Sequence, residues 1–200
     1  MKIRTTCFIT AACLLFAAPV FAGPADFKQG QTIPEFGKIA VVNVDQPVYR
    51  HHKFKVAFDV DKQAEAGKLN RNLVSAARFI NMHTAAGVKG KNIKLAVIVH
   101  GTATKDMTRA EYYAASQAKN DKTKNDKARD DKGGEDIKAN ANAALIKTLI
   151  DHGVEFYVCG QSAAYYDVKN QDLLPGVKMA LSAMTAHALL QQQGYTLNPF

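Results

Sequence analysis

Val154-Glu155-Phe156-Tyr157-Val158-Cys159-Gly160-Gln161-Ser162 is the stretch from which the fold of this chain is best predicted. Its first five residues suit a buried strand, which ends at a cysteine that glycine and small polar residues follow at once. The next four residues, Ala163-Ala164-Tyr165-Tyr166, predict the opening of a helix. In an open α/β sheet, ligands and reactive groups gather at the carboxyl ends of strands, so Cys159 stands where a functional side chain is expected.

Two interpretations of Cys159 are open from its position alone. A cysteine at the start of a helix lies near the positive end of the helix dipole, which favours its thiolate. A lone cysteine is also often a small buried hydrophobic side chain without reactivity.

Strand and helix patterns alternate before this stretch. Phe54–Val60 predicts a strand with one face more buried, and Ile93–Val99 is a near-continuous apolar run, typical of a central parallel strand. Apolar residues at helical spacing predict helices from about 63 to 86 and from about 136 to 152, each followed by glycine.

The same alternation continues after Cys159. A short helix is expected first, then a strand at 177–180 and a helix for which Ser182 is the N-cap. Gly194 ends that helix, and an edge strand at 195–197 follows. The alternation predicts a three-layer α/β/α sandwich with a mainly parallel sheet of about five strands.

The N-terminus has the pattern of a secretory signal peptide. Lys2 and Arg4 are basic, residues 7–20 are apolar, and the run closes at the small residue Ala22, after which cleavage is expected. The apolar stretch is short for a membrane span, so stable membrane insertion is not expected and the predicted compartment is the periplasm. An uncleaved anchor and a lipoprotein signal at Cys13 are the alternatives.

Removal of this segment changes the cysteine count. Cys7 and Cys13 leave with it, so Cys159 is the single cysteine of the mature chain. In an oxidising compartment most cysteines pair, and a leftover one suggests a free reactive thiol or an intermolecular bond.

The remaining chain divides into an arm and one domain. Residues 23–53 are interpreted as an N-terminal arm, within which Ile39–Val44 is either an edge strand or a segment that packs on a neighbouring subunit. Residues 54–200 form a single domain. A charged stretch at 119–135 lacks large apolar residues and is interpreted as a mobile surface loop or a helical extension.

Charge and motifs exclude several classes of function. Removal of Lys2 and Arg4 lowers the formal charge from +8 to +6, and many lysines alternate with acids, so no nucleic-acid partner is expected. The chain has no phosphate-binding loop and no Cys-x-x-Cys dithiol. Its histidines lack metal-binding spacing, so no metal site is predicted.

His100 marks a second strand end. It follows the apolar run directly and precedes the flexible Gly101. It is either a functional imidazole beside the cysteine or a neutral histidine hydrogen-bonded to backbone.

Three segments together resemble the DsrE/DsrF-like family of sulfur metabolism: Val99–Gly101, Val158–Ser162, and the tail from Leu173-Leu174-Pro175-Gly176-Val177 to Gln193-Gly194-Tyr195. The resemblance spans about 54–199. It implies a small α/β protein that forms trimers or hexamers and carries sulfane sulfur as a persulfide on a cysteine. Cys159 matches that position, and His100 matches a strand-end position. The predicted export and the charged stretch depart from the well-understood cytoplasmic members.

The resemblance implies a sulfur carrier or a sulfurtransferase-like protein with Cys159 and His100 as catalytic residues. Gly101, Gly160, Gln161 and Ser162 would contact the substrate, with the backbone N–H groups of the short helix stabilising the anion. No metal or organic cofactor is implied, and the partner would be a small sulfur compound or a sulfur-relay protein. The alternative is a non-catalytic, exported, oligomeric module that binds a small ligand or serves assembly, with an inert buried cysteine.

The predicted signal peptide can be tested on the exported protein. N-terminal sequencing of the exported protein should start at Gly23, because the small residue at Ala22 completes a signal-peptidase site. A mature protein that starts at Met1 would contradict the predicted export.

Overall fold

The computed structural model describes residues 23–125 and 139–198, and the side chains of 119–125 are not described. The predicted signal peptide and much of the charged stretch lie outside these residues. None of the helices in the described part of the chain is long and apolar enough to cross a membrane.

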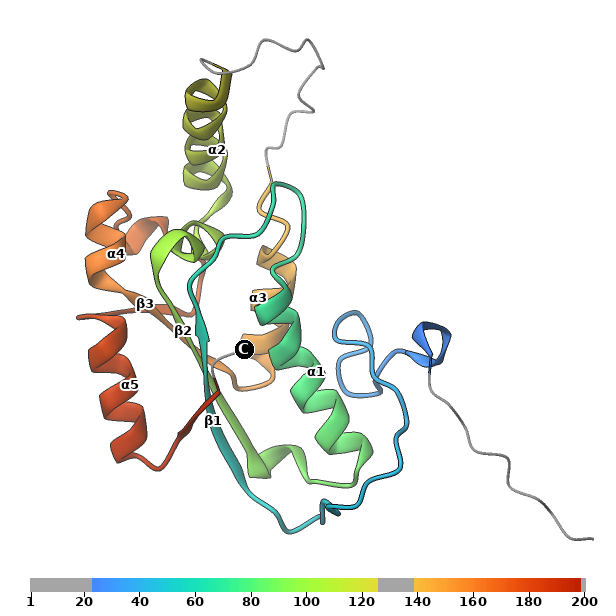
Figure 1. The fold of residues 1–200 in the computed structure, drawn as a ribbon. Helices are drawn as coiled ribbons and strands as arrows, with labels where there is room; N and C mark the ends of the chain where they lie inside the picture. The colour runs from blue at the N-terminus through green and yellow to red at the C-terminus, as the bar shows by residue number, and fades with distance from the viewer. Residues whose placement is uncertain (1–22, 126–138, 199–200) are drawn as a thin grey trace, which may run out of the picture.

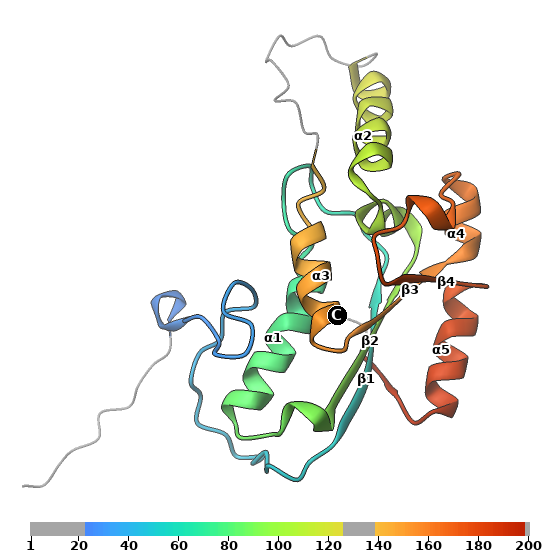
Figure 2. The same cartoon turned by 180° about the vertical axis from the view of Figure 1, so that it is seen from behind.

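Five parallel strands form one sheet in the order β4-β3-β2-β1-β5. They are β1 (Phe54–Val60), β2 (Ile93–Val99), β3 (Glu155–Cys159), β4 (Val177–Ala180) and β5 (Thr196–Asn198). Helices α1 and α3 cover one face of the sheet and α5 covers the other, as Figures 1 and 2 show. The predicted three-layer α/β/α sandwich with a parallel sheet is confirmed.

The helices connect the strands in sequence order. They are α1 (Arg71–Ala85), α2 (Ala110–Asn125), α3 (Ala143–Asp151), α4 (Gly160–Tyr165) and α5 (Ala183–Gln192), with short 3₁₀ segments η1 (Pro24–Asp26), η2 (Gly90–Asn92), η3 (Gly101–Met107) and η4 (Asn170–Asp172). Helix α2 enters the charged stretch and projects away from the rest of the fold (Figure 1).

Two helices begin later than their sequence patterns predict. Helix α1 begins at Arg71 because Asn70 adopts an extended backbone and its side chain caps the helix, accepting from the Asn72 N–H at 3.0 Å. Helix α3 begins at Ala143. Before it, the Asn140 amide donates to the Asp106 and Thr108 carbonyls at 2.7 and 2.9 Å, which ties that residue to another segment.

The N-terminal arm packs on α1. Asn81 of α1 is fully buried, accepts from the Ile33 N–H at 2.9 Å, and has Nδ2 3.0 Å from the Ile33 carbonyl. Ile39–Val44 forms no strand of the sheet, so its edge-strand interpretation is wrong. Only Ile39 of that segment pairs, in an isolated antiparallel bridge with Lys28.

The two faces of the sheet carry unequal cores. The larger core lies between the sheet and helices α1 and α3. The core on the α5 face is small, and half of its residues are alanine: Ala57, Ala96, Ile98, Ala186, Leu190 and Tyr195. Because side chains alternate along a strand, the residues two positions beyond Ala57 and Ile98 share this face, and they are Asp59 and His100.

Asp106, in η3, is a fully buried carboxyl group. Its Oδ2 accepts from the Ala64 N–H and the Asn70 amide, both at 2.9 Å, while its Oδ1 has no hydrogen-bond partner in the described part of the chain. Burial raises the pKa of Asp106 from 3.8 to about 6, although these two hydrogen bonds oppose the change. The native state therefore binds this proton more tightly than the unfolded chain.

We expect Asp106→Asn to remove a pH-dependent loss of stability. A carboxyl pKa that is raised in the native state lowers the free energy of unfolding as pH rises from about 4 to about 6, by up to about 3 kcal/mol. Urea unfolding of the wild type and the variant at several pH values should give a difference that grows across this range in favour of the variant. Asp151→Asn, on the surface of α3, is the control, and a constant difference for Asp106→Asn would contradict the expectation.

Candidate active site

Cys159 ends β3 and is the residue from which α4 starts. Its side chain is buried, with 7% of the residue exposed, and it forms no disulfide. Parallel pairing sets Cys159 beside Ala180 of β4 on one side, and Val158 beside Val99 of β2 on the other. The cysteine therefore lies at the carboxyl edge of the sheet, as its sequence position predicts.

Hydrogen bonds from two helices favour the thiolate of Cys159. Burial raises the pKa of the thiol, but the Ser162 N–H, the Ala183 N–H, the Ser162 hydroxyl and the Gln161 N–H oppose burial, and the pKa is lowered. Ala183 is the first residue of α5, so the sulfur faces the amino ends of both α4 and α5. Unpaired N–H groups at helix amino ends stabilise an anion, so this sulfur is suited to react as a nucleophile.

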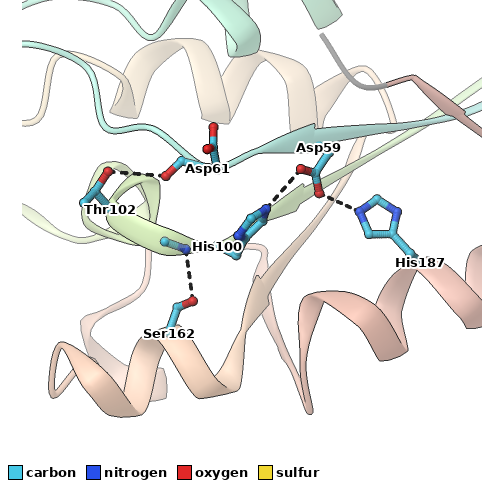
Figure 3. A network of polar contacts seen from close by, with 7 residues as sticks. Asp59, Asp61, His100, Thr102, Ser162 and His187 are labelled. Carbon is cyan, nitrogen blue, oxygen red and sulfur yellow. Dashed lines mark hydrogen bonds and ion pairs between the residues drawn. The ribbon is translucent and has the colours of Figure 1, made fainter.

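His100 leaves β2 and is engaged by a carboxylate. Its Nε2 lies 3.0 Å from Oδ2 of Asp59, on β1, and the other oxygen of Asp59 lies 2.6 Å from Nε2 of His187, on α5 (Figure 3). An ionised carboxylate only accepts hydrogen bonds, so both imidazoles carry a proton on Nε2. When His100 is neutral, its Nδ1 is therefore the basic nitrogen.

Asp59 stays ionised between the two histidines. Burial raises the pKa of its carboxyl, but hydrogen bonds from His100 and then His187 oppose burial, and the pKa is lowered. About 30% of its side chain is exposed, so water still reaches the carboxylate. The Nδ1 atom of His187 is buried and has no hydrogen-bond partner in the described residues.

His100 and Cys159 occupy the same face of neighbouring strands. Val99 pairs with Val158 in parallel register, so the residues that follow them, His100 and Cys159, are neighbours at the strand ends. A second link joins the two turns, because the Gly101 N–H donates to Oγ of Ser162 at 3.0 Å (Figure 3). The Ser162 hydroxyl also helps to lower the pKa of the Cys159 thiol, so it links the His100 turn to the cysteine.

Backbone packing requires both glycines of the predicted site. Gly101 has φ +53°, and a Cβ there would lie 2.8 Å from the Asp61 carbonyl oxygen. A Cβ on Gly160 would lie 2.6 Å from the Ala180 carbonyl oxygen. Gly160 therefore lets α4 start against the end of β4. This packing accounts for a glycine at position 160, and contact with a substrate is not needed to explain it.

The sequence-predicted site misses Asp59 and His187. Asp59 is a charged residue near the end of a buried strand. His100 is identified from the same kind of position, so Asp59 could have been predicted from the sequence in the same way. His187 lies within a helix, where nothing in the local pattern distinguishes it. In residues 23–125 and 139–198, no three His, Cys, Asp or Glu side chains are arranged to hold a metal ion.

The chain is similar to proteins of one known family. A family model described as the DsrE/DsrF-like family matches residues 55–199. No curated protein sequence matches the chain. Two solved structures, a protein of unknown function from Methanobacterium thermoautotrophicum and the ychN protein from E. coli, are 15% and 14% identical, with TM-scores of 0.49 and 0.45. Each comparison covers 74% of this chain and 100% of the other. The chain belongs to the DsrE/DsrF-like family.

Proposed function

We propose that this protein carries sulfane sulfur as a persulfide on Cys159. The observation that supports the proposal is the pairing of a sulfur that faces the amino ends of two helices with a histidine at the next strand end. A persulfide forms only from an ionised and accessible thiol, and the hydrogen bonds to this sulfur favour ionisation. The family, which is associated with sulfur relay, supports the same chemistry.

The proposed step transfers one sulfur atom and needs no oxidant. The Cys159 thiolate attacks the outer sulfur of a donor R–S–S⁻, a bond forms between the two sulfurs, and the S–S bond of the donor breaks. Cys159 then holds –S–S⁻, and the donor leaves as R–S⁻. Thiosulfate reacts in the same way and leaves as sulfite.

His100 is proposed to move the proton in this step. Neutral His100 accepts the thiol proton on Nδ1, the imidazolium is stabilised by Asp59, and the proton then passes to the departing thiolate. The total charge on thiol, donor and product is unchanged by this cycle.

The proposed setting is the periplasm, after removal of residues 1–22. The proposed partners are a small sulfur compound or a sulfur-relay protein, and further copies of the same chain. Exposed apolar side chains beside the site, Leu181 and Met184, support association of copies, since 73% and 79% of these residues are exposed.

The low exposure of Cys159 favours the second candidate function, a binding or assembly module with an inert thiol. Iodoacetamide labelling of the folded protein distinguishes the two. Fast labelling at neutral pH supports sulfur carriage, and protection until denaturation supports the inert module.

We expect Cys159→Ser to abolish sulfur loading and to leave the fold intact, because serine replaces the sulfur with little change in volume. Incubation with a low-molecular-weight persulfide, followed by mass spectrometry of the native protein, should show one added sulfur atom on the wild type and none on the variant. Loading that persists in Cys159→Ser would contradict the proposal.

We expect His100→Gln to slow loading by a factor on the order of 10², because a proton-transfer group contributes at least this much. His152→Gln is the matched control, since His152 lies at the end of α3 and, among the described residues, its ring bonds to backbone carbonyls. An equal loss of rate in the two variants would contradict the proposed proton-transfer role of His100.

Light scattering at micromolar concentration should show a homo-oligomer, a trimer or a hexamer. Met184→Lys should shift the protein toward the monomer, because a charge on an exposed apolar side chain opposes its burial. A wild-type protein that is monomeric throughout would contradict this part of the proposal.

A further inference from the structure

We propose that Asp59 is a positioning residue that assembles the sulfur site from two directions. One carboxylate oxygen orients His100, and the other holds the amino end of α5 against the sheet through His187. The inference rests on the proposed role of Cys159 as a nucleophile.

The first contact determines which nitrogen of His100 is basic. Oδ2 of Asp59 accepts from Nε2 at 3.0 Å, which leaves Nδ1 with the lone pair when the ring is neutral. About a third of the His100 side chain is exposed, so packing alone does not hold the ring. The carboxylate therefore supplies both the orientation and the tautomer.

The second contact acts at a distance through α5. His187 and Ala183 are four residues apart, so they lie on the same side of the helix, one turn from each other. Oδ1 of Asp59 binds Nε2 of His187 at 2.6 Å, which ties this turn to β1. One turn earlier lies Ala183, whose N–H is among the groups that lower the pKa of the Cys159 thiol. Through His187, Asp59 thus helps to position the Ala183 N–H relative to Cys159.

Helix α5 depends on this polar contact because its apolar contacts are few. The helix buries Ala186 and Leu190 in the small core and packs the partly buried Ala183 against it, while Met184 and Leu189 are exposed. Ser182 caps the helix by accepting from the Thr185 N–H at 3.0 Å, which orders the first turn but does not attach it to the sheet. The contact between His187 and the Asp59 carboxylate adds a directional attachment to the apolar contact of Ala183.

The charged and titratable groups at this edge of the sheet come from four elements. They are Asp59 of β1, His100 after β2, Cys159 of β3 and His187 of α5, with the exposed carboxylate of Asp61 after β1. A test must therefore change the position of α5 without changing the net charge beside the sulfur. His187→Gln and His187→Leu form such a pair, since neither side chain carries a charge and only glutamine can donate to Asp59.

The experiment measures the pH dependence of Cys159 alkylation by iodoacetamide in the complete mature protein, with no sulfur donor. His187→Leu removes the donor to Asp59 and should raise the apparent pKa of the thiol by on the order of 1. At pH values below the wild-type thiol pKa, the alkylation rate should then fall about tenfold, in proportion to the thiolate. His187→Gln keeps an N–H group at the place of Nε2 and should restore the wild-type value.

Asp59→Asn provides an independent measurement if His187→Leu fails to fold. An amide offers one accepting oxygen and one donating NH₂, so one of the two imidazoles must move its proton from Nε2 to Nδ1. Nitrogen-15 NMR of the ring nitrogens should show both His100 and His187 as Nε2–H tautomers in the wild type and only one of the two in Asp59→Asn. His83, His152 and the other histidines are internal controls.

The outcomes separate this inference from the proposed function. A shifted thiol pKa in His187→Leu, with no persulfide on the wild type, supports the positioning role and rejects sulfur carriage. Unchanged alkylation in His187→Leu, with normal loading of the wild type, overturns the positioning role and leaves sulfur carriage standing. Two retained Nε2–H tautomers in Asp59→Asn would also overturn it.

Discussion

The in-register parallel pairing of β1, β2 and β3 is the constraint on which the site depends. Val60 pairs with Val99, and Val99 pairs with Val158, so all three strands reach the same edge of the sheet together. Parallel strands require crossover connections, which here bring residues 41 positions apart, Asp59 and His100, within hydrogen-bond distance. A shift of one residue in either pair would send the side chains to opposite faces.

A balance of burial against hydrogen bonding sets the chemistry of Cys159. Burial alone would hold the thiol protonated and make the residue inert. Four hydrogen-bond donors, from α4 and the start of α5, reverse that effect. One of these donors belongs to α5, a helix that the chain forms after β4, so the lowering of the thiol pKa depends in part on where α5 lies.

The unequal cores explain how a half-buried carboxylate is tolerated in the sheet. On the α1 and α3 face, large apolar side chains from the strands and both helices fill the space beside the sheet. On the α5 face the strands carry alanines, and the polar residues Asp59 and His100 lie on the same face at the carboxyl ends of β1 and β2. Asp59 keeps part of its hydration there and receives two hydrogen bonds, which offset the loss of the remaining hydration.

Local sequence patterns determined the strands, the helix ends at glycine, and the placement of Cys159 and His100 at strand ends, because periodicity and turn residues act over short distances. The beginnings of α1 and α3 could not be predicted, since Asn70 and Asn140 are held by segments far away in the chain. Only the tertiary structure brought Asp59 and His187 together, 128 positions apart. That contact depends on strand order and on the packing of α5, which no local pattern encodes.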